Sequence, residues 1–161
     1  MNRPIVAVIG TADASAELAD QAFEVGALIA KAGFTLVTGG LTGVMESASR
    51  GANEAGGIVV GILPGGDAQA ANAFVTIPIP TNMGHARNVI IAHTADMLIA
   101  VGGGFGTLSE IAVARKLGKP VFAISSWEIA DAHPVASAPE AIEACQRYLD
   151  ELIFPPQKRK N

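Results

Sequence analysis

The groups in this sequence that could do chemistry are a glycine cluster at residues 102–106 and two charged side chains near it, Arg87 and Glu110. The cluster follows an apolar run at 97–101 and opens into a segment with helical spacing at 108–117, which predicts a strand, a glycine turn and a helix in succession. Glycines let successive backbone N–H groups turn inward, and the following helix directs the positive end of its dipole at the same point. The sequence therefore predicts a phosphate-binding turn.

Two other turns repeat this plan, at residues 10–11 and at residues 38–43. If the sheet is parallel, all three turns lie at the carboxyl ends of their strands and can face one ligand. Glycine is also common in tight turns that bind no phosphate, so this pattern alone leaves both interpretations open. The candidate binding residues on the three turns are Gly10, Thr11, Thr38, Gly39, Gly40, Gly43, Gly103, Gly104, Phe105, Gly106 and Thr107.

Arg87 lies early in the segment 84–94, whose apolar residues have helical spacing. A guanidinium among apolar neighbours needs an acceptor, and a phosphate offers two oxygens that match its fork. A salt bridge or exposure to solvent would satisfy the same side chain. The sequence therefore leaves two alternatives for Arg87, a phosphate ligand or an ordinary surface contact.

Glu110 also has two interpretations. In the first, residues 107–110 form a capping box, in which Thr107 caps the helix and Glu110 reaches back to the Thr107 amide. In the second, its carboxylate lies beside the phosphate site, where it holds a ribose hydroxyl or stabilises a developing oxocarbenium ion. Spacing alone favours the cap.

Several common chemistries are not supported by the sequence. No Gly-x-Gly-x-x-Gly follows the first predicted strand, and no Gly-Lys-Ser/Thr is present, which argues against an ordinary dehydrogenase or a P-loop enzyme. His85 and His93 fall on different faces of an ideal helix and His133 is isolated, so no metal site is expected. Cys145 is the only cysteine, which excludes a disulfide within the chain.

The composition indicates one domain spanning residues 1–161, with a flexible tail at 155–161. Charged residues are 16% of the chain, against a typical figure of about 25%, which predicts a homo-oligomer, a dimer or a tetramer, that covers part of the surface. The net charge of −4 argues against a nucleic-acid or membrane partner. No apolar stretch reaches the roughly 18 residues of a membrane span, and we expect a cytoplasmic protein.

Strand and helix patterns alternate along the chain, which predicts a doubly wound α/β sheet, mainly parallel, with helices on both faces. Residues 74–80 are extended but contain prolines, so we expect them at a sheet edge, and residues 125–138 have no clear period. Glycines at 51 and 56 weaken one helix and suggest close packing on the sheet. The other predicted strands are 5–9, 34–37, 58–63, 97–101 and 120–124, and the predicted helices are 15–32, 44–55, 84–94, 108–117 and 137 to about 153.

Three blocks of this sequence, TGGLTGVM at residues 38–45, Arg87-Asn88, and GGGFGTLSE at residues 102–110, resemble the LOG-like (SLOG) superfamily. The resemblance extends over about residues 5–124. It implies a Rossmann-like fold and a homo-oligomer, and nothing in the sequence suggests a pyridoxal-phosphate lysine.

Within that superfamily, the resemblance implies two functions. In its phosphoribohydrolases, which release free base and ribose 5-phosphate from nucleoside monophosphates, the motif arginine and glutamate are the catalytic pair, matching Arg87 and Glu110. Here, however, Asn88 replaces a lysine, Val101 replaces a proline, and residues 83–86 differ from the usual Met-His.

These departures look more like the molybdenum-cofactor carrier proteins, which bind a phosphorylated pterin. The leading interpretation is therefore a carrier of a phosphorylated small molecule, the molybdenum cofactor or a nucleotide, held by the three turns with Arg87, Asn88 and Glu110. The hydrolase is the alternative, and a sensor that recruits a protein partner when loaded is a third possibility.

Overall fold

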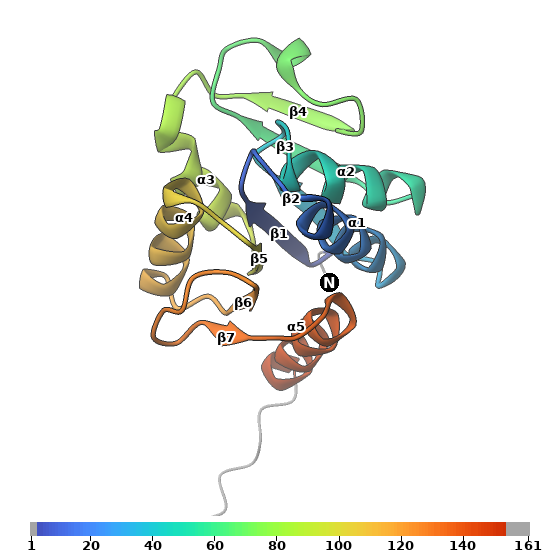
Figure 1. Ribbon diagram of the computed structural model, residues 1–161, viewed down its shortest axis with the longest axis vertical. Helices are drawn as coiled ribbons and strands as arrows, with labels where there is room; N and C mark the ends of the chain where they lie inside the picture. Colours follow the sequence, from blue (N-terminus) through green and yellow to red (C-terminus); the bar gives the residue numbers. More distant parts are fainter. Residues whose placement is uncertain (1–2, 154–161) are drawn as a thin grey trace, which may run out of the picture.

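The computed structural model describes residues 3–153, which form a seven-stranded parallel sheet with helices on both faces (Figure 1). The predicted tail at 155–161 lies outside the described residues. The strands are β1 (Ile5–Gly10), β2 (Thr35–Thr38), β3 (Val59–Leu63), β4 (Ile77–Pro80), β5 (Met97–Val101), β6 (Val121–Ile124) and β7 (His133–Pro134). The helices are α1 (Ala16–Lys31), α2 (Val44–Glu54), α3 (Arg87–Thr94), α4 (Phe105–Lys116) and α5 (Ala138–Ile153), with short 3₁₀ helices η1 (Ala68–Ala70) and η2 (Gly84–Ala86).

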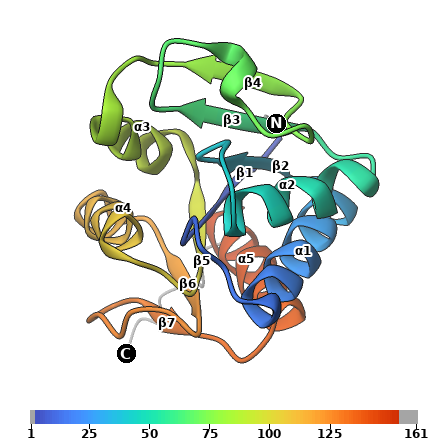
Figure 2. The same cartoon turned by 45° about the horizontal axis from the view of Figure 1, so that its top comes forward.

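The strands lie in the order β4-β3-β2-β1-β5-β6-β7. Helices α1, α2 and α5 cover one face of the sheet, and α3 and α4 cover the other (Figure 2). The predicted doubly wound α/β fold is therefore confirmed. The chain order reverses between β1 and β5, and in such sheets a crevice for ligands opens at this point, beyond the carboxyl ends of the strands.

The central strands are apolar because both faces of the sheet are buried. Val6 and Val8 of β1 point into the cluster under α1, α2 and α5, whereas Ala7 and Ile9 point into the cluster under α3 and α4. All four side chains are at most 2% exposed. Burying an aliphatic side chain of this kind stabilises a fold by about 1.5–3 kcal/mol, so these two clusters hold the strand ends in fixed positions.

Helices α1 and α2 approach each other closely through two glycines. A Cβ atom at Gly26 would overlap the carbonyl of Ala48, and one at Gly51 would overlap the carbonyl of Phe23. The prediction that Gly51 packs on the sheet was therefore wrong, because it packs on α1. Gly56 has a φ of +76° just beyond α2, a conformation that favours glycine and ends the helix.

Other element boundaries differ from the sequence predictions in informative ways. The segment 84–94 is the 3₁₀ turn η2 followed by α3, and Gly84 at its start has a φ of +57°, which a residue within an α-helix does not adopt. Strand β4 is an edge strand, as its prolines predicted. β7 was not predicted, since two residues have no periodicity, yet it extends the opposite edge of the sheet beside β6.

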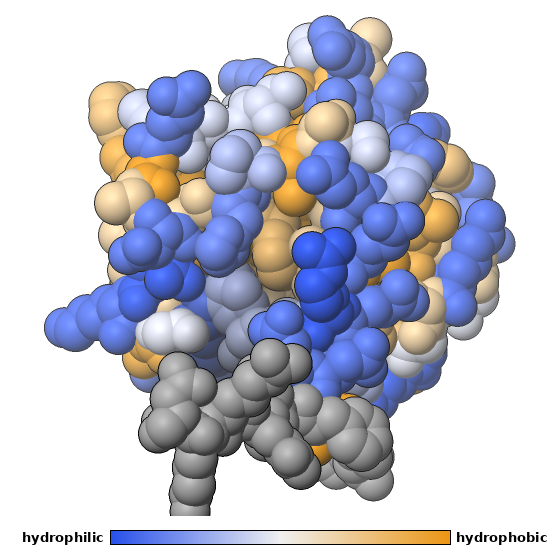
Figure 3. Space-filling model, turned by 90° about the horizontal axis from the view of Figure 1, so that it is seen from below, coloured by the Kyte–Doolittle hydropathy of each residue, from blue (hydrophilic) through white to orange (hydrophobic). Residues whose placement is uncertain are grey.

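The surface seen in Figure 3 is mostly hydrophilic, and its apolar side chains form small separate patches. Among the described residues, no helix combines the length and apolar character needed to cross a membrane.

Candidate functional site

A pocket of about 270 Å³ opens at the carboxyl ends of the strands, next to the point where the chain order reverses. The turns after β1 and β2, the η2 turn, the start of α3 and the first turns of α4 all contribute to its walls. The residues that line it are Gly10, Thr11, Ala12, Leu41, Met45, His85, Arg87, Asn88, Gly104, Gly106, Thr107 and Glu110.

Arg87 is the first residue of α3 and only 8% exposed. Its Nη1 donates to the carbonyl of Gly39, at 2.6 Å, and to the carbonyl of Ile62. Burial lowers the pKa of this guanidinium, and the negative charge of Glu110 opposes the shift. Because arginine stays protonated in proteins, Arg87 is a buried cation clamped to the ends of two strands.

The clamp uses only one nitrogen of the guanidinium. Within the described residues, Nε and Nη2 of Arg87 form no hydrogen bond with the protein. They form the side-on edge of the fork, which can donate to two oxygens of one phosphate or carboxylate. Arg87 therefore has its orientation fixed by the protein and its second donor pair left for a ligand.

Gly39 makes this arrangement possible. A Cβ atom at this position would overlap the Arg87 guanidinium and would lie 2.5 Å from the sulfur of Met45. The glycine thus leaves the space that the arginine occupies. Gly39 was predicted to bind the ligand, but it does not line the pocket. Its contribution is to leave room for Arg87.

Glu110 lies one helical turn inside α4 and is 7% exposed. Burial raises the pKa of its carboxyl group to about 7, and the charge of Arg87 opposes that rise. No hydrogen bond or ion pair to this carboxyl group is found within residues 3–153. The side chain lines the pocket, so its oxygens are directed to a ligand or to water.

The predicted capping box at residues 107–110 was wrong. Helix α4 begins at Phe105, with Gly104 as the N-cap and no side-chain cap. Thr107 is therefore inside the first turn and 2% exposed, and Glu110 is too far into the helix to reach a free amide at its start. The carboxyl group is available to the pocket because it does not cap the helix.

The glycine turn after β5 has the backbone geometry of an anion site. Gly102 and Gly103 have φ values of +57° and +143°, which favour glycine. The first amides of α4, at residues 105–107, have no carbonyl partner within the helix, and they lie at the positive end of its dipole. These features are typical of backbone that binds a phosphate or another anion.

Asn88 connects the two helices at the pocket. Its Nδ2 donates to Ser109 Oγ, at 3.2 Å, and Ser109 Oγ donates to the carbonyl of Gly106, at 2.6 Å. Asn88 therefore carries no charge, unlike the lysine of the phosphoribohydrolase motif, and its hydrogen bond links α3 to α4. The pocket wall is less cationic as a result.

The structure places some predicted residues away from the pocket. Thr38 is fully buried, and its hydroxyl accepts a hydrogen bond from the Gly40 amide. Gly40 and Gly43 have φ values of +74° and +67° and shape the turn after β2. Gly103 packs on Thr107, and Phe105 points outward at the rim. None of these five residues is among those that line the pocket, although Gly103 and Phe105 flank Gly104, which is.

Four lining residues were not among the predicted binding residues: Ala12, Leu41, Met45 and His85. His85 lies two residues before Arg87 in the η2 turn, and the sequence analysis considered it only as a metal ligand. Its position only two residues before Arg87 was the feature of the sequence that could have identified it as a pocket residue. Leu41 and Met45 lie in the block 38–45 that carries the family resemblance, but they were not named as binding residues. Ala12 had no signal in the sequence.

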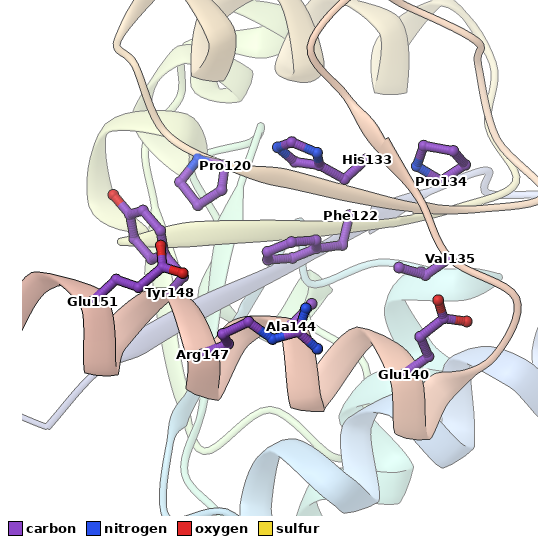
Figure 4. Close-up of a pocket in the computed structure, with 10 residues that line it drawn as sticks. All are labelled: Pro120, Phe122, His133, Pro134, Val135, Glu140, Ala144, Arg147, Tyr148 and Glu151. Carbon is purple, nitrogen blue, oxygen red and sulfur yellow. The ribbon is translucent and has the colours of Figure 1, made fainter. Parts of the chain in front are cut away.

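A second pocket, of about 340 Å³, lies between α5 and strands β6 and β7 (Figure 4). Its floor is Phe122, whose ring contacts that of His133 with the centroids 5.8 Å apart. Arg147, Glu140 and Glu151 lie along α5 on its other side. None of the predicted binding residues lines this pocket.

The chain is similar in sequence to two curated proteins. The chain is 47% identical to a protein of Archaeoglobus fulgidus over 87% of this chain and 93% of that one. It is 34% identical to the cytokinin riboside 5'-monophosphate phosphoribohydrolase of Mycobacterium tuberculosis, over 70% of this chain and 65% of the hydrolase.

Solved structures are similar over a larger share of the chain. The molybdenum cofactor binding protein of Rippkaea orientalis superimposes with a TM-score of 0.88 at 36% identity, covering 92% of this chain and 99% of the other. The molybdenum cofactor carrier protein of Chlamydomonas reinhardtii gives a TM-score of 0.84 at 38% identity, with the same coverage of both chains. The model of the SLOG cluster4 family matches residues 3–148. The predicted SLOG resemblance is confirmed, and the chain belongs to the SLOG cluster4 family.

Proposed function

We propose that this protein binds and carries the molybdenum cofactor, or a closely similar pterin that bears a phosphate, in the pocket at the carboxyl ends of the strands. The observation that carries the proposal is the free edge of Arg87, a buried cation held by two backbone carbonyls and facing a cradle of glycine turns. The likeness to the carrier proteins of Chlamydomonas reinhardtii and Rippkaea orientalis supports the choice of ligand.

The residues present fit such a ligand in charge and in polarity. Arg87 pairs with the phosphate through Nε and Nη2, and the amides at residues 103–107 donate to its remaining oxygens. Leu41 and Met45 give one wall an apolar surface. The carboxyl group of Glu110, with its pKa near 7, orients a polar edge of the ligand as donor when protonated and as acceptor when ionised.

A titration of the purified protein with molybdopterin under anaerobic conditions tests the proposal. We expect saturable binding at one site per chain, which Arg87→Ala weakens about 1,000-fold and Arg147→Ala leaves within about twofold. Arg147 is the matched control because it is an exposed arginine that lines the α5 pocket. Equal binding by wild type and Arg87→Ala would contradict the proposal.

A nucleoside 5'-monophosphate phosphoribohydrolase is the second candidate. The observation that favours it is that Arg87 and Glu110 line one pocket, as the catalytic pair of that reaction requires. In this mechanism Arg87 binds the phosphate and Glu110 stabilises the ribosyl cation. Incubation with AMP distinguishes the two functions: release of adenine that Glu110→Gln abolishes establishes the hydrolase, and its absence supports the carrier.

We also infer that the protein is a cytoplasmic homo-oligomer, a dimer or a tetramer. The exposed apolar side chains Ile77, Ile79 and Met83, which are 48%, 41% and 53% exposed, support a contact between copies at the β4 edge. Light scattering on the purified protein measures the mass directly. A mass of one chain at micromolar concentration would contradict this inference.

A further inference from the structure

Two aromatic rings lie together beside Gly104, a residue that lines the strand-end pocket; Trp127 itself lines a separate pocket beside the loop after β6. Phe105 is the first residue of α4, and its side chain is 82% exposed. Trp127 comes from the loop between β6 and β7 and is 37% exposed. The two ring centroids are 6.0 Å apart and the planes are tilted by 34°, which is within the usual range of aromatic contacts.

Phe105 is the most exposed large apolar side chain in residues 3–153. A single exposed phenyl ring needs no explanation, but the contact with Trp127 makes an apolar patch that is open to a partner. Its two neighbours in the chain, Gly104 and Gly106, both line the pocket. The ring is thus attached to the segment that we propose binds the phosphate.

Trp127 is held to the same segment by a hydrogen bond. Its Nε1 donates to the carbonyl of Gly104, at 3.1 Å. This bond joins the loop after β6 to the glycine turn after β5, and it fixes the indole beside Phe105. The aromatic pair is therefore oriented by the protein before any ligand arrives, which lowers the entropy cost of binding.

The volume of the pocket indicates what the pair could contact. Pockets that enclose a whole cofactor measure about 300–1,000 Å³. The strand-end pocket measures about 270 Å³, which is enough for a phosphate and the atoms next to it. If the phosphate lies at the glycine turn, Phe105 is the aromatic side chain next to it in the chain, between the lining residues Gly104 and Gly106.

From these observations we infer that Phe105 and Trp127 form an aromatic platform on which the planar heterocycle of the phosphorylated ligand stacks. This inference rests on the proposed function, because it assumes that the phosphate lies against Arg87. It adds a second point of recognition that discriminates ligands with a flat heterocycle from simple phosphates. Stacking of a heterocyclic base on an aromatic side chain is tolerant of the ring's substituents, so purine and pterin rings both suit the platform.

The experiment compares two probes, molybdopterin and inorganic phosphate, by calorimetry on wild type, Phe105→Ala and Phe105→Tyr. We expect Phe105→Ala to weaken molybdopterin binding about 10-fold and to leave phosphate binding unchanged, whereas Phe105→Tyr retains both affinities. Leu152→Ala is the control for loss of an exposed apolar side chain, since Leu152 is 62% exposed on α5, and it should alter neither affinity.

Trp127 provides an independent measurement, because it is the only tryptophan in the chain. We expect molybdopterin to quench its fluorescence and phosphate to leave it unchanged. If Phe105→Ala weakens both probes equally or neither, the platform is wrong while the phosphate site stands. If Phe105→Ala changes the mass of the oligomer and leaves both affinities unchanged, the ring belongs to a contact between copies. That result also overturns the platform. If wild type binds neither probe, both the proposed function and the platform fail.

Discussion

The strand-end pocket and the α5 pocket contain the same kinds of charged side chain, but they hold them differently. In the strand-end pocket, Arg87 is 8% exposed and fixed by two backbone carbonyls. In the α5 pocket, Arg147 is exposed on the surface of its helix. Because Arg87 is buried, little water competes for its guanidinium. An anion that reaches it therefore forms a strong, oriented interaction.

The glutamates differ in the same way. Glu110 has no protein partner within the described residues and a pKa raised to about 7. Glu140 is already used, because one of its carboxylate oxygens accepts a hydrogen bond from the Ala136 amide, at 2.7 Å. The α5 pocket is the larger of the two, at about 340 Å³ against about 270 Å³. Volume therefore does not identify the functional site, whereas oriented and unpartnered charge does.

The largest expected effect is on ligand affinity in Arg87→Ala. Loss of one partner from a buried charge pair costs about 2–5 kcal/mol, so the affinity for molybdopterin should fall about 1,000-fold. The matched variant Arg147→Ala should stay within about twofold of wild type, since exposed ion pairs contribute about 0–1 kcal/mol. Calorimetric titration of both variants measures the difference. If Arg87→Ala and Arg147→Ala lose similar amounts of affinity for molybdopterin, the strand-end pocket is not the specific binding site.

The second effect is a pH dependence of stability that comes from Glu110. Its pKa is raised in the folded protein to about 7 from an ordinary value of 4.5. The folded state therefore binds the proton more tightly than the unfolded state, and the free energy of unfolding falls as the pH rises from about 4.5 to about 7. The loss should reach at most about 3 kcal/mol.

Denaturant unfolding of wild type and Glu110→Gln across this pH range checks the prediction. The glutamine cannot ionise, so the variant should lack this part of the pH dependence and be the more stable protein above pH 7. Glu140→Gln is the control from the α5 pocket. Parallel curves for wild type and Glu110→Gln would show that this carboxyl group does not titrate near neutral pH.

A third test concerns the space that Arg87 occupies. In Gly39→Ala, the new methyl group overlaps the guanidinium and must displace it. We expect the affinity for molybdopterin to fall about 30-fold, which corresponds to about 2 kcal/mol. Gly65→Ala is the matched control, because a Cβ atom there has no neighbour within 4 Å. An unchanged affinity in Gly39→Ala would mean that the position of Arg87 is unimportant.

The smallest effect is expected at Glu140 in the α5 pocket. Glu140→Ala removes the acceptor for the Ala136 amide at the start of α5, and such a loss lowers the free energy of unfolding by about 1 kcal/mol. Ligand affinity should not change. Thermal unfolding and a molybdopterin titration on the same sample measure the two quantities. Weaker binding in this variant would assign the ligand to the α5 pocket.

Most of the fold could be predicted from the sequence because buried parallel strands and amphipathic helices leave strong patterns. The run at β5 is apolar without interruption, and α1 spans Ala16–Lys31, close to the helix predicted at 15–32. The short strand β7 could not be predicted, since His133 and Pro134 are held by their pairing with β6 and by no pattern of their own.

The site was predictable only in part. The glycine turns predicted an anion site at the strand ends, and the motifs of the superfamily singled out Arg87 and Glu110. The role of Gly39 depends on a contact across 48 positions of the chain, which no local pattern contains. The capping box at residues 107–110 fitted the local sequence, but the glycine turn lets α4 begin earlier, and the sequence alone did not distinguish these two starts.

A crystal structure of the complex with molybdopterin tests the central claim most directly. The account predicts that the phosphate lies at the glycine turn after β5, within hydrogen-bond distance of the amides at residues 103–107 and of Arg87 Nε and Nη2. A phosphate bound in the α5 pocket, or one bound with no contact to Arg87, would contradict it.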